Sequence, residues 1–352
     1  MPKHHSKVPE LIGLTPIATV TDPQVWRYLV TPQVRALLGP ITHAGEPQVK
    51  DSIAGFFPGD EVSNLNDHRL FGGSDKYTRY PYISTLYRTA YGALVIKRDF
   101  AKIKALGWIG DVMRGKGEFI YKAALRDRRF DGTLRANDSP LLDFPYDDPK
   151  YNLPLPGGVS SLEVSIYGFM PGSRIAALGG ELEFENFVAN PFTFLGDPEK
   201  FLTLFNRAFR SQRAPGMVAA PIIDVSKIIG GGFDTLARFK KYDFVEDAAS
   251  HYHVAMFAQS IGYRPTYADQ AENLRQLTEA IARVKAAGHQ ISRPQESWLC
   301  ALQSLRPVEM IPEKFYFGGP YWQQDNISQE NLWMNKPLSP KAAELMKTPI
   351  IR

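Results

Sequence analysis

The chain has 352 residues, of which 44% are hydrophobic and 22% charged, a composition typical of a folded globular protein rather than a disordered one. Its 41 basic and 37 acidic residues give a formal net charge of +4, which by itself identifies no partner. The single cysteine, Cys300, excludes an internal disulfide framework and a cysteine-based metal site. Because it lies in an apolar run, we predict a buried structural thiol rather than a nucleophile.

The N-terminal region predicts a loose arm over residues 1–16, followed by a first strand over 17–20 or 34–38. The arm is basic but lacks the apolar segment of a signal peptide. No run of 18 apolar residues follows, so we expect no membrane span. These features predict a cytoplasmic protein with no membrane partner.

The middle of the chain alternates between loop-like and helix-like patterns. Residues 45–78 are rich in Gly, Asp and Asn and predict a long inserted loop, a feature that is usually functional. Residues 99–158 predict a helical, basic insertion whose second half, 131–158, is rich in Asp, Pro and Gly. Apolar residues at steps of three and four predict helices over 85–95, 100–113 and 119–128.

Residues 159–352 predict the remainder of the fold, beginning with a hairpin. Leu162, Val164 and Ile166 alternate with polar residues and predict a strand. After a turn at Pro171-Gly172, a return strand is predicted with Leu182, Phe184 and Phe187 on one face.

Two helices are predicted further on, over 198–210 and 268–287. Thr266 can cap the longer one, and Gly288 ends it. An aromatic-rich tail with a short basic helix closes the chain. Taken together, the elements predict an α+β fold, one elaborated domain over 1–352.

Charge is distributed unevenly along the chain. From Arg79 to Arg129 there are twelve basic and four acidic residues, whereas the following segment is acidic. Such a patch can attract phosphates through counterion release. A solvated helical face explains the same pattern equally well on charge alone.

Catalytic and metal-binding patterns are weak. His251 and His253 form the closest histidine pair, but no third ligand of a suitable type is near in sequence. His43 lacks an activated nucleophile, Ser173 lacks the spacing of a nucleophile elbow, and Asp51 stands alone. We therefore predict no enzyme activity, no metal and no cofactor.

A glycine triplet, Gly230-Gly231-Gly232, lacks the residues of a phosphate-binding P-loop and predicts a hairpin or wide loop. Basic and aromatic residues alternate just after it, from Arg238 to Tyr242. On a strand, this alternation would place Arg238, Lys240 and Tyr242 on one face. Basic groups beside exposed backbone and aromatic rings suit single-stranded nucleic acid.

Three motifs in this order resemble a known family. They are Gly39-Pro-Ile-Thr-His-Ala-Gly45 after a strand, Ile83-Ser-Thr-Leu-Tyr-Arg88-Thr, and the glycine triplet at 230–232. Their order resembles the repeat-associated (RAMP) proteins of CRISPR systems, and more narrowly the backbone subunit of class 1 effector complexes in the plasmid-type (type IV) version. The first loop is one residue longer than usual, and the second motif lacks its Pro-Gly pair.

The resemblance implies a modified RRM-like (ferredoxin-like) palm with a helical insertion and a β-hairpin thumb. It implies a non-catalytic subunit that oligomerises along CRISPR guide RNA. The other implied partners are target nucleic acid, with DNA favoured over RNA, further copies of the chain, and other CRISPR-associated subunits. Some relatives cut RNA with an Asp in the first loop, for which Asp51 is the only counterpart.

The resemblance and the charge pattern together give the expected contact residues. The RNA-binding set is Arg79, Arg88, Lys97, Arg98, Arg114, Lys116, Lys122, Lys227, Arg238 and Lys240. The backbone-contact loops are Gly39, His43, Gly45, Gly230, Gly231 and Gly232. Two alternatives remain open: a coat or capsid-type assembly protein, which the Pro/Gly-rich loops and basic arm suit, and a hydrolase using His43 and Asp51.

Overall fold

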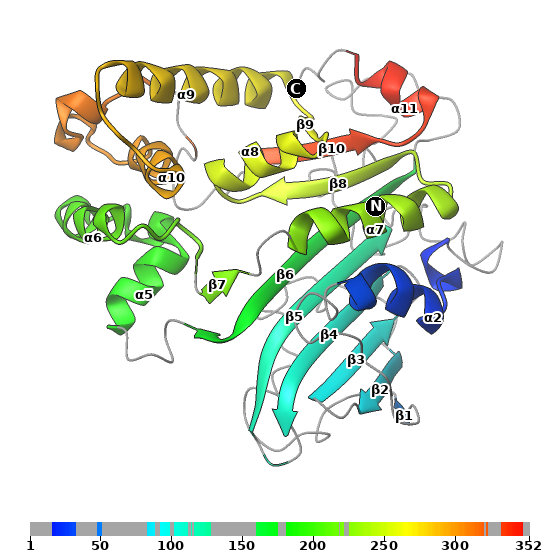
Figure 1. Ribbon diagram of the computed structural model, residues 1–352. Helices are drawn as coiled ribbons and strands as arrows, with labels where there is room; N and C mark the ends of the chain where they lie inside the picture. Colours follow the sequence, from blue (N-terminus) through cyan, green and yellow to red (C-terminus); the bar gives the residue numbers. More distant parts are fainter. Residues whose placement is uncertain are drawn as a thin grey trace, which may run out of the picture. The chain divides into compact units, whose positions relative to one another are not determined.

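The computed structural model shows an α+β protein with a mostly antiparallel sheet and helices (Figure 1). The structure describes residues 16–32, 48–50, 83–88, 92–98, 102–111, 114, 116–127, 160–174, 181–217, 219–221, 225–319, 322 and 332–347. The chain divides into two compact units. Unit 1 comprises residues 1–172, 221–246 and 337–344, and unit 2 comprises 173–220, 247–336 and 345–352.

Unit 1 is built on a sheet with the strand order β1-β2-β3-β4-β5-β6-β8. Neighbouring strands are antiparallel except β6 and β8, which are parallel. The strands are β1 (Gln48–Lys50), β2 (Ile83–Arg88), β3 (Gly92–Arg98), β4 (Lys102–Asp111), β5 (Lys116–Asp127), β6 (Ser161–Arg174) and β8 (Phe244–Ala249).

Helical segments pack on one face of this sheet. They are η2 (Ile17–Thr19), α2 (Asp22–Val25), η3 (Trp26–Val30) and α7 (Val225–Phe239). A further helix, α11 (Pro340–Leu345), lies near the end of the chain. Figure 1 shows α2 and α7 in front of the sheet, while the β4–β5 hairpin extends away from both. The face under the helices is apolar because residues such as Leu94, Ile96, Ile103 and Leu125 are buried there.

Polar contacts attach the N-terminal segment to the strands. The guanidinium of Arg98 forms an ion pair with Asp22 and donates to the carbonyl oxygen of Val20. The Tyr87 hydroxyl donates to the same aspartate, and the buried Tyr121 hydroxyl donates to the Leu29 carbonyl. These bonds satisfy polar groups that would otherwise be costly to bury.

Unit 2 is mainly helical. Its helices are α5 (Leu182–Ala189), η11 (Pro191–Phe194), α6 (Pro198–Arg210), α8 (Tyr252–Ser260), α9 (Ala268–Ala286), α10 (Arg293–Leu302), η12 (Val308–Met310) and η13 (Glu313–Phe315). The short strands are β7 (Ala219–Pro221), β9 (Arg264–Pro265) and β10 (Leu332–Pro337). The core centres on the fully buried Trp298, which stacks on Phe187 at 5.3 Å between ring centroids and donates its indole N–H to the Arg213 carbonyl.

Several predicted elements are confirmed. The helix over 198–210 is α6, capped by the Asp197 side chain, and the helix over 268–287 is α9. Gly288 follows α9 with a φ of +90°, the conformation that favours glycine after a helix. Tyr267 rather than Thr266 occupies the N-cap position. The strand at 162–166 forms part of β6, and the short helix predicted near the end of the chain is α11, which carries one lysine and one glutamate and so is not basic.

Other predictions are wrong. The predicted helices at 85–95, 100–113 and 119–128 lie in strands β2 to β5, so the described part of the 99–158 insertion before β6 is extended rather than helical. Strands β3 to β5 bury residues on both faces, which produces apolar runs that imitate helical spacing.

Several predictions about turns, loops and short strands are also wrong. β6 continues through Pro171, and the expected return strand is the helix α5. The glycine triplet lies in α7, and Arg238–Tyr242 is the end of that helix and a turn. Residues 17–19 form a 3-10 helix, and 48–50 in the predicted first loop form β1. The predicted strand at 34–38, the arm at 1–15 and residues 131–158 lie outside the described residues.

Candidate nucleic-acid interface

Basic side chains gather on one face of the unit 1 sheet, opposite the helical layer. Lys97 on β3 is the direct cross-strand partner of Lys104 on β4. Lys122 on β5 pairs with Leu106, two residues along from Lys104, so its side chain lies on the same face. Diagonal neighbours in an antiparallel sheet lie about 7–8 Å apart, so these three cations form one cluster, the lysine cluster.

The lysine cluster is buried. Lys97, Lys104 and Lys122 are each 3% exposed, and each takes part in interactions within the protein. Arg126, two residues along from Lys122, forms an ion pair with Glu163 on β6. Lysine side chains buried to this extent cannot contact a phosphate in solvent directly.

Exposed cations lie at one end of the same sheet. Arg88 ends β2 and is opposite Ala93 at the start of β3, which in turn is opposite Trp108 near the end of β4. Arg114 and Lys116 lie at or beside the β4–β5 turn. All three basic residues are exposed, so this hairpin end presents cations to solvent.

The acids near the hairpin end leave these cations available. Arg114 lies 3.5 Å from Asp111, but its side chain is 80% exposed, and such surface pairs contribute about 0–1 kcal/mol. Both carboxylate oxygens of Glu118 accept from the Gly172 N–H at 2.9 Å, which engages this acid with β6. The pair with Asp111 therefore restrains the Arg114 side chain only weakly.

Two aromatic rings lie beside these cations. Trp108 and Phe119 are cross-strand partners with ring centroids 5.3 Å apart. Trp108 is buried, whereas Phe119 is half-buried. The sequence reasoning missed both rings and also Lys104. The alternation Lys102-Ile-Lys104-Ala-Leu106 was the available signal, and the helical interpretation of this segment hid it.

Three other predicted RNA contacts have structural partners in unit 1. Arg98 binds Asp22 under the N-terminal segment, and burial lowers the pKa of its guanidinium. Arg238 donates to the Leu338 carbonyl, and Lys240 donates to the carbonyl and hydroxyl of Thr19. Burial lowers the pKa of Lys240. The structure therefore does not bring these residues to the hairpin end.

Some of the remaining predicted residues lie in α7, and the others lie outside the residues that the structure describes. Lys227 lies in the first turn of α7, and Gly230 to Gly232 lie in its middle. Arg79, Gly39, His43, Gly45 and Asp51 lie outside the described residues. Within α7, Gly232 packs so closely on η3 that an added Cβ would lie 2.0 Å from the Tyr28 carbonyl oxygen.

The histidine pair lies in unit 2. His251 precedes α8 and stacks between Phe192 and His253, with ring centroids 5.8 and 5.9 Å away. Burial lowers the pKa of His251 to about 3, with a further contribution from His253, and lowers the pKa of His253 to about 4, with a further contribution from Arg293. Among the residues that the structure describes, no three His, Cys, Asp or Glu side chains cluster as metal ligands.

Cys300 is a buried free thiol, as predicted, and burial raises its pKa well above the ordinary value. A thiol that resists ionisation is a poor nucleophile. The Ser173 hydroxyl donates to the Ala220 carbonyl at 3.2 Å. Neither residue presents an activated nucleophile.

No protein-family model, curated protein or solved structure matches this chain. Within the described ranges, none of the helices combines the length and hydrophobicity needed to cross a bilayer.

Proposed function

We propose that this chain is a non-catalytic RNA-binding subunit that oligomerises along a CRISPR guide RNA as the backbone of an effector complex. The observation that carries the proposal is the hairpin end of the unit 1 sheet. There Arg88, Arg114 and Lys116 are exposed, and the lysine cluster lies in the strands behind them. The proposal of a CRISPR complex in particular rests on the three sequence motifs whose order resembles that of the RAMP proteins.

The arrangement suits a single-stranded polyanion. Exposed Arg and Lys side chains bind phosphates, and the half-buried Phe119 beside them offers a ring edge to a base. An antiparallel sheet covered by helices on one face supports a palm of the RRM-like class, and we assign the β4–β5 hairpin as its thumb.

The partners follow from the same proposal. Further copies of the chain would follow the guide, other CRISPR-associated subunits would complete the complex, and DNA would be the target, in the cytoplasm. Expression of the chain beside a CRISPR array should yield a copurifying RNA of discrete length and uniform 5′ sequence. Closed particles without a guide, seen by electron microscopy, would instead indicate a coat protein.

Replacing Arg88, Arg114 and Lys116 together with alanine should weaken RNA binding and flatten its salt dependence. Each lost phosphate contact lowers the slope of log K against log salt by about 0.7 for single strands, so we expect a decrease of about 2. Titration of a labelled single-stranded RNA between low and physiological salt measures the slope.

The matched control is Arg283→Ala, which removes an exposed arginine from α9 in unit 2. It should leave the slope unchanged. Equal slopes for the triple variant and the wild type would contradict a phosphate-binding role for the hairpin end.

A further inference from the structure

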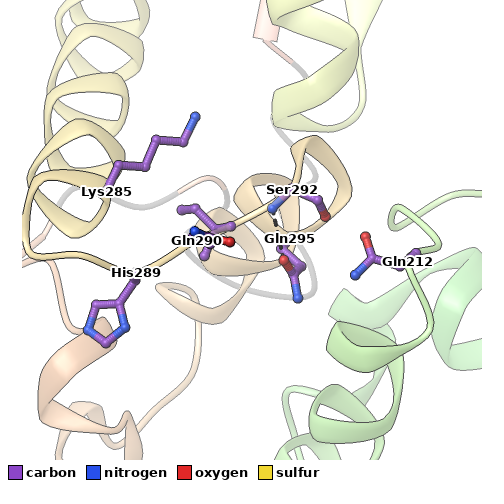
Figure 2. Close-up of a pocket in the computed structure, with 7 residues that line it drawn as sticks. Gln212, Lys285, His289, Gln290, Ser292 and Gln295 are labelled. Carbon is purple, nitrogen blue, oxygen red and sulfur yellow. Dashed lines mark hydrogen bonds between the residues drawn. The ribbon is translucent and has the colours of Figure 1, made fainter.

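Two large hydrophobic side chains protrude from the surface of this protein. Of the large hydrophobic residues that the structure describes, Leu182 and Phe239 are the most exposed, at 75% and 60%. Neither lines the open depression of unit 2 beside Gln212, where His289 points away from Gln212 (Figure 2). A single exposed apolar residue is ordinary on a protein surface, so the surroundings of these two residues decide what they can do.

Phe239 ends an exposed stripe along α7. Gly231, Thr235 and Phe239 follow one another at steps of four, which places them on the same face of the helix, and all three are exposed. The Thr235 hydroxyl donates to the Gly231 carbonyl at 2.8 Å, so its methyl group is the part available for a contact. A Cβ added at Gly231 would meet nothing within 4 Å, which leaves the helix backbone open there. The stripe is therefore low and apolar, about 12 Å long, with a ring at its end.

Positive charge surrounds this ring. Arg238 and Lys241 are exposed, and the Lys240 ammonium lies 5.3 Å from the centre of the Phe239 ring. Arg238 and Lys240 donate to neutral oxygens, so these contacts do not compensate their charges. Asp243, the next acid along the chain, accepts from two serine hydroxyls. The end of α7 therefore favours a partner that combines an apolar side chain with negative charge.

Leu182 has the opposite surroundings. It is the first residue of α5 and stands between Glu181 and Glu183, whose side chains are 60% and 46% exposed. Glu181 pairs with Arg207 and Glu183 with Lys200, and exposed pairs of this kind restrain the carboxylates only weakly. The start of α5 is therefore an apolar side chain flanked by two carboxylates, which is the combination that the end of α7 favours.

We propose that the start of α5 in one copy of the chain docks on the end of α7 in the next copy. Leu182 packs against the Phe239 ring, and its two flanking carboxylates face the cations at the end of α7. Because the two surfaces differ, each copy carries one of each, and the copies join head to tail. The contact needs no RNA, so the inference goes beyond the guide-binding proposal.

A second copy explains this surface better than a nucleic acid does. The cations occupy only the last turn of α7 and the residues after it, whereas the exposed stripe before them is apolar and offers nothing to a row of phosphates. The docked area is small, which predicts a weak contact. Copies bound next to one another on one strand would still use it, because tethering raises their effective concentration to about the millimolar range.

Sedimentation velocity of the full chain without RNA, from about 1 µM to about 500 µM, tests the docking. The wild type should associate, and Leu182→Gln or Phe239→Gln should each weaken association about tenfold or more, because each removes one apolar half of the contact. Each variant keeps one intact surface, so an equimolar mixture of the two should form dimers and nothing larger. Tyr316→Gln, at a 40% exposed ring of unit 2, is the control and should associate like the wild type.

Charge reversal tests the electrostatic part of the contact. Glu183→Lys and Lys241→Glu should each weaken association, because each places like charges opposite one another. The chain that carries both substitutions should associate like the wild type. A change in the stability of either unit would not produce this recovery.

The proposal is overturned if the wild type stays monomeric over this range, if the mixture stays monomeric, or if association survives both apolar substitutions. Weaker RNA binding by Phe239→Gln with unchanged association would assign the end of α7 to nucleic acid, and would also overturn it. Replacement of Arg88, Arg114 and Lys116 should leave association without RNA unchanged, so each of the two proposals can fail alone.

Discussion

Replacing Gly232 with alanine should destabilise unit 1 by about 3 kcal/mol, because the added methyl group would meet backbone that cannot move alone. In α7 the new Cβ would lie 2.0 Å from the Tyr28 carbonyl oxygen and 3.1 Å from its carbon. Either α7 or η3 would have to shift. Urea denaturation followed by circular dichroism gives the change in the free energy of unfolding.

Gly231 provides the control one residue earlier. An added Cβ there would meet nothing within 4 Å, and the residue is exposed. Gly231→Ala should therefore raise stability by about 0.5–1 kcal/mol, the usual gain of alanine over glycine in a helix. If both variants retained full stability but lost RNA binding, the glycines would be backbone contacts for a guide, as the sequence resemblance implies.

Acid should destabilise unit 2 selectively through His251 and His253. Both imidazoles are neutral in the folded state, with pKa values of about 3 and about 4, against an ordinary value of 6.5. The unfolded chain therefore binds protons that the folded chain does not. The contribution of the two neutral histidines to the free energy of unfolding is fully present above about pH 6.5 and is lost as the pH drops toward 4. At pH 5 the loss should be about 2 kcal/mol per histidine.

Hydrogen exchange measured at matched chemical exchange rates between pH 7.5 and pH 5 tests this in α8 and α10. The His251→Gln/His253→Gln variant should lose most of the pH dependence, whatever its stability at neutral pH. His289→Gln, at an exposed position, should keep the wild-type dependence. An unchanged pH dependence in the double variant would contradict the assignment to this buried pair.

The sequence predicted the helices of unit 2 better than the strands of unit 1, for a physical reason. Helix α9 has one apolar face, with Leu274, Leu277, Ile281 and Val284 buried and charged residues opposite. This leaves a period of 3.6 in the sequence. Helix α6 has the same character, with buried Phe201 and Phe205.

Strands β3 to β5 carry no comparable signal because both of their faces are covered. In β3 the five residues from Ala93 to Lys97 are all buried, so the alternation expected of a half-exposed strand is missing. The lysine cluster depends on cross-strand register between Lys97 and Lys104, which no local pattern fixes. Arg88, Arg114 and Lys116 were predicted as individual contacts, but their common position at the hairpin end needed the topology.

The attachment of the N-terminal segment also constrains how the chain can fold while it is being made. Leu29 accepts its hydrogen bond from Tyr121, which is 92 residues further along. At a synthesis rate of about 5–20 residues per second, roughly 5–18 seconds pass before that partner leaves the ribosome. Until then the apolar side chains of Val25, Leu29 and Val30 have no sheet to cover them. The nascent chain therefore exposes this apolar N-terminal segment for several seconds, during which a chaperone could bind it.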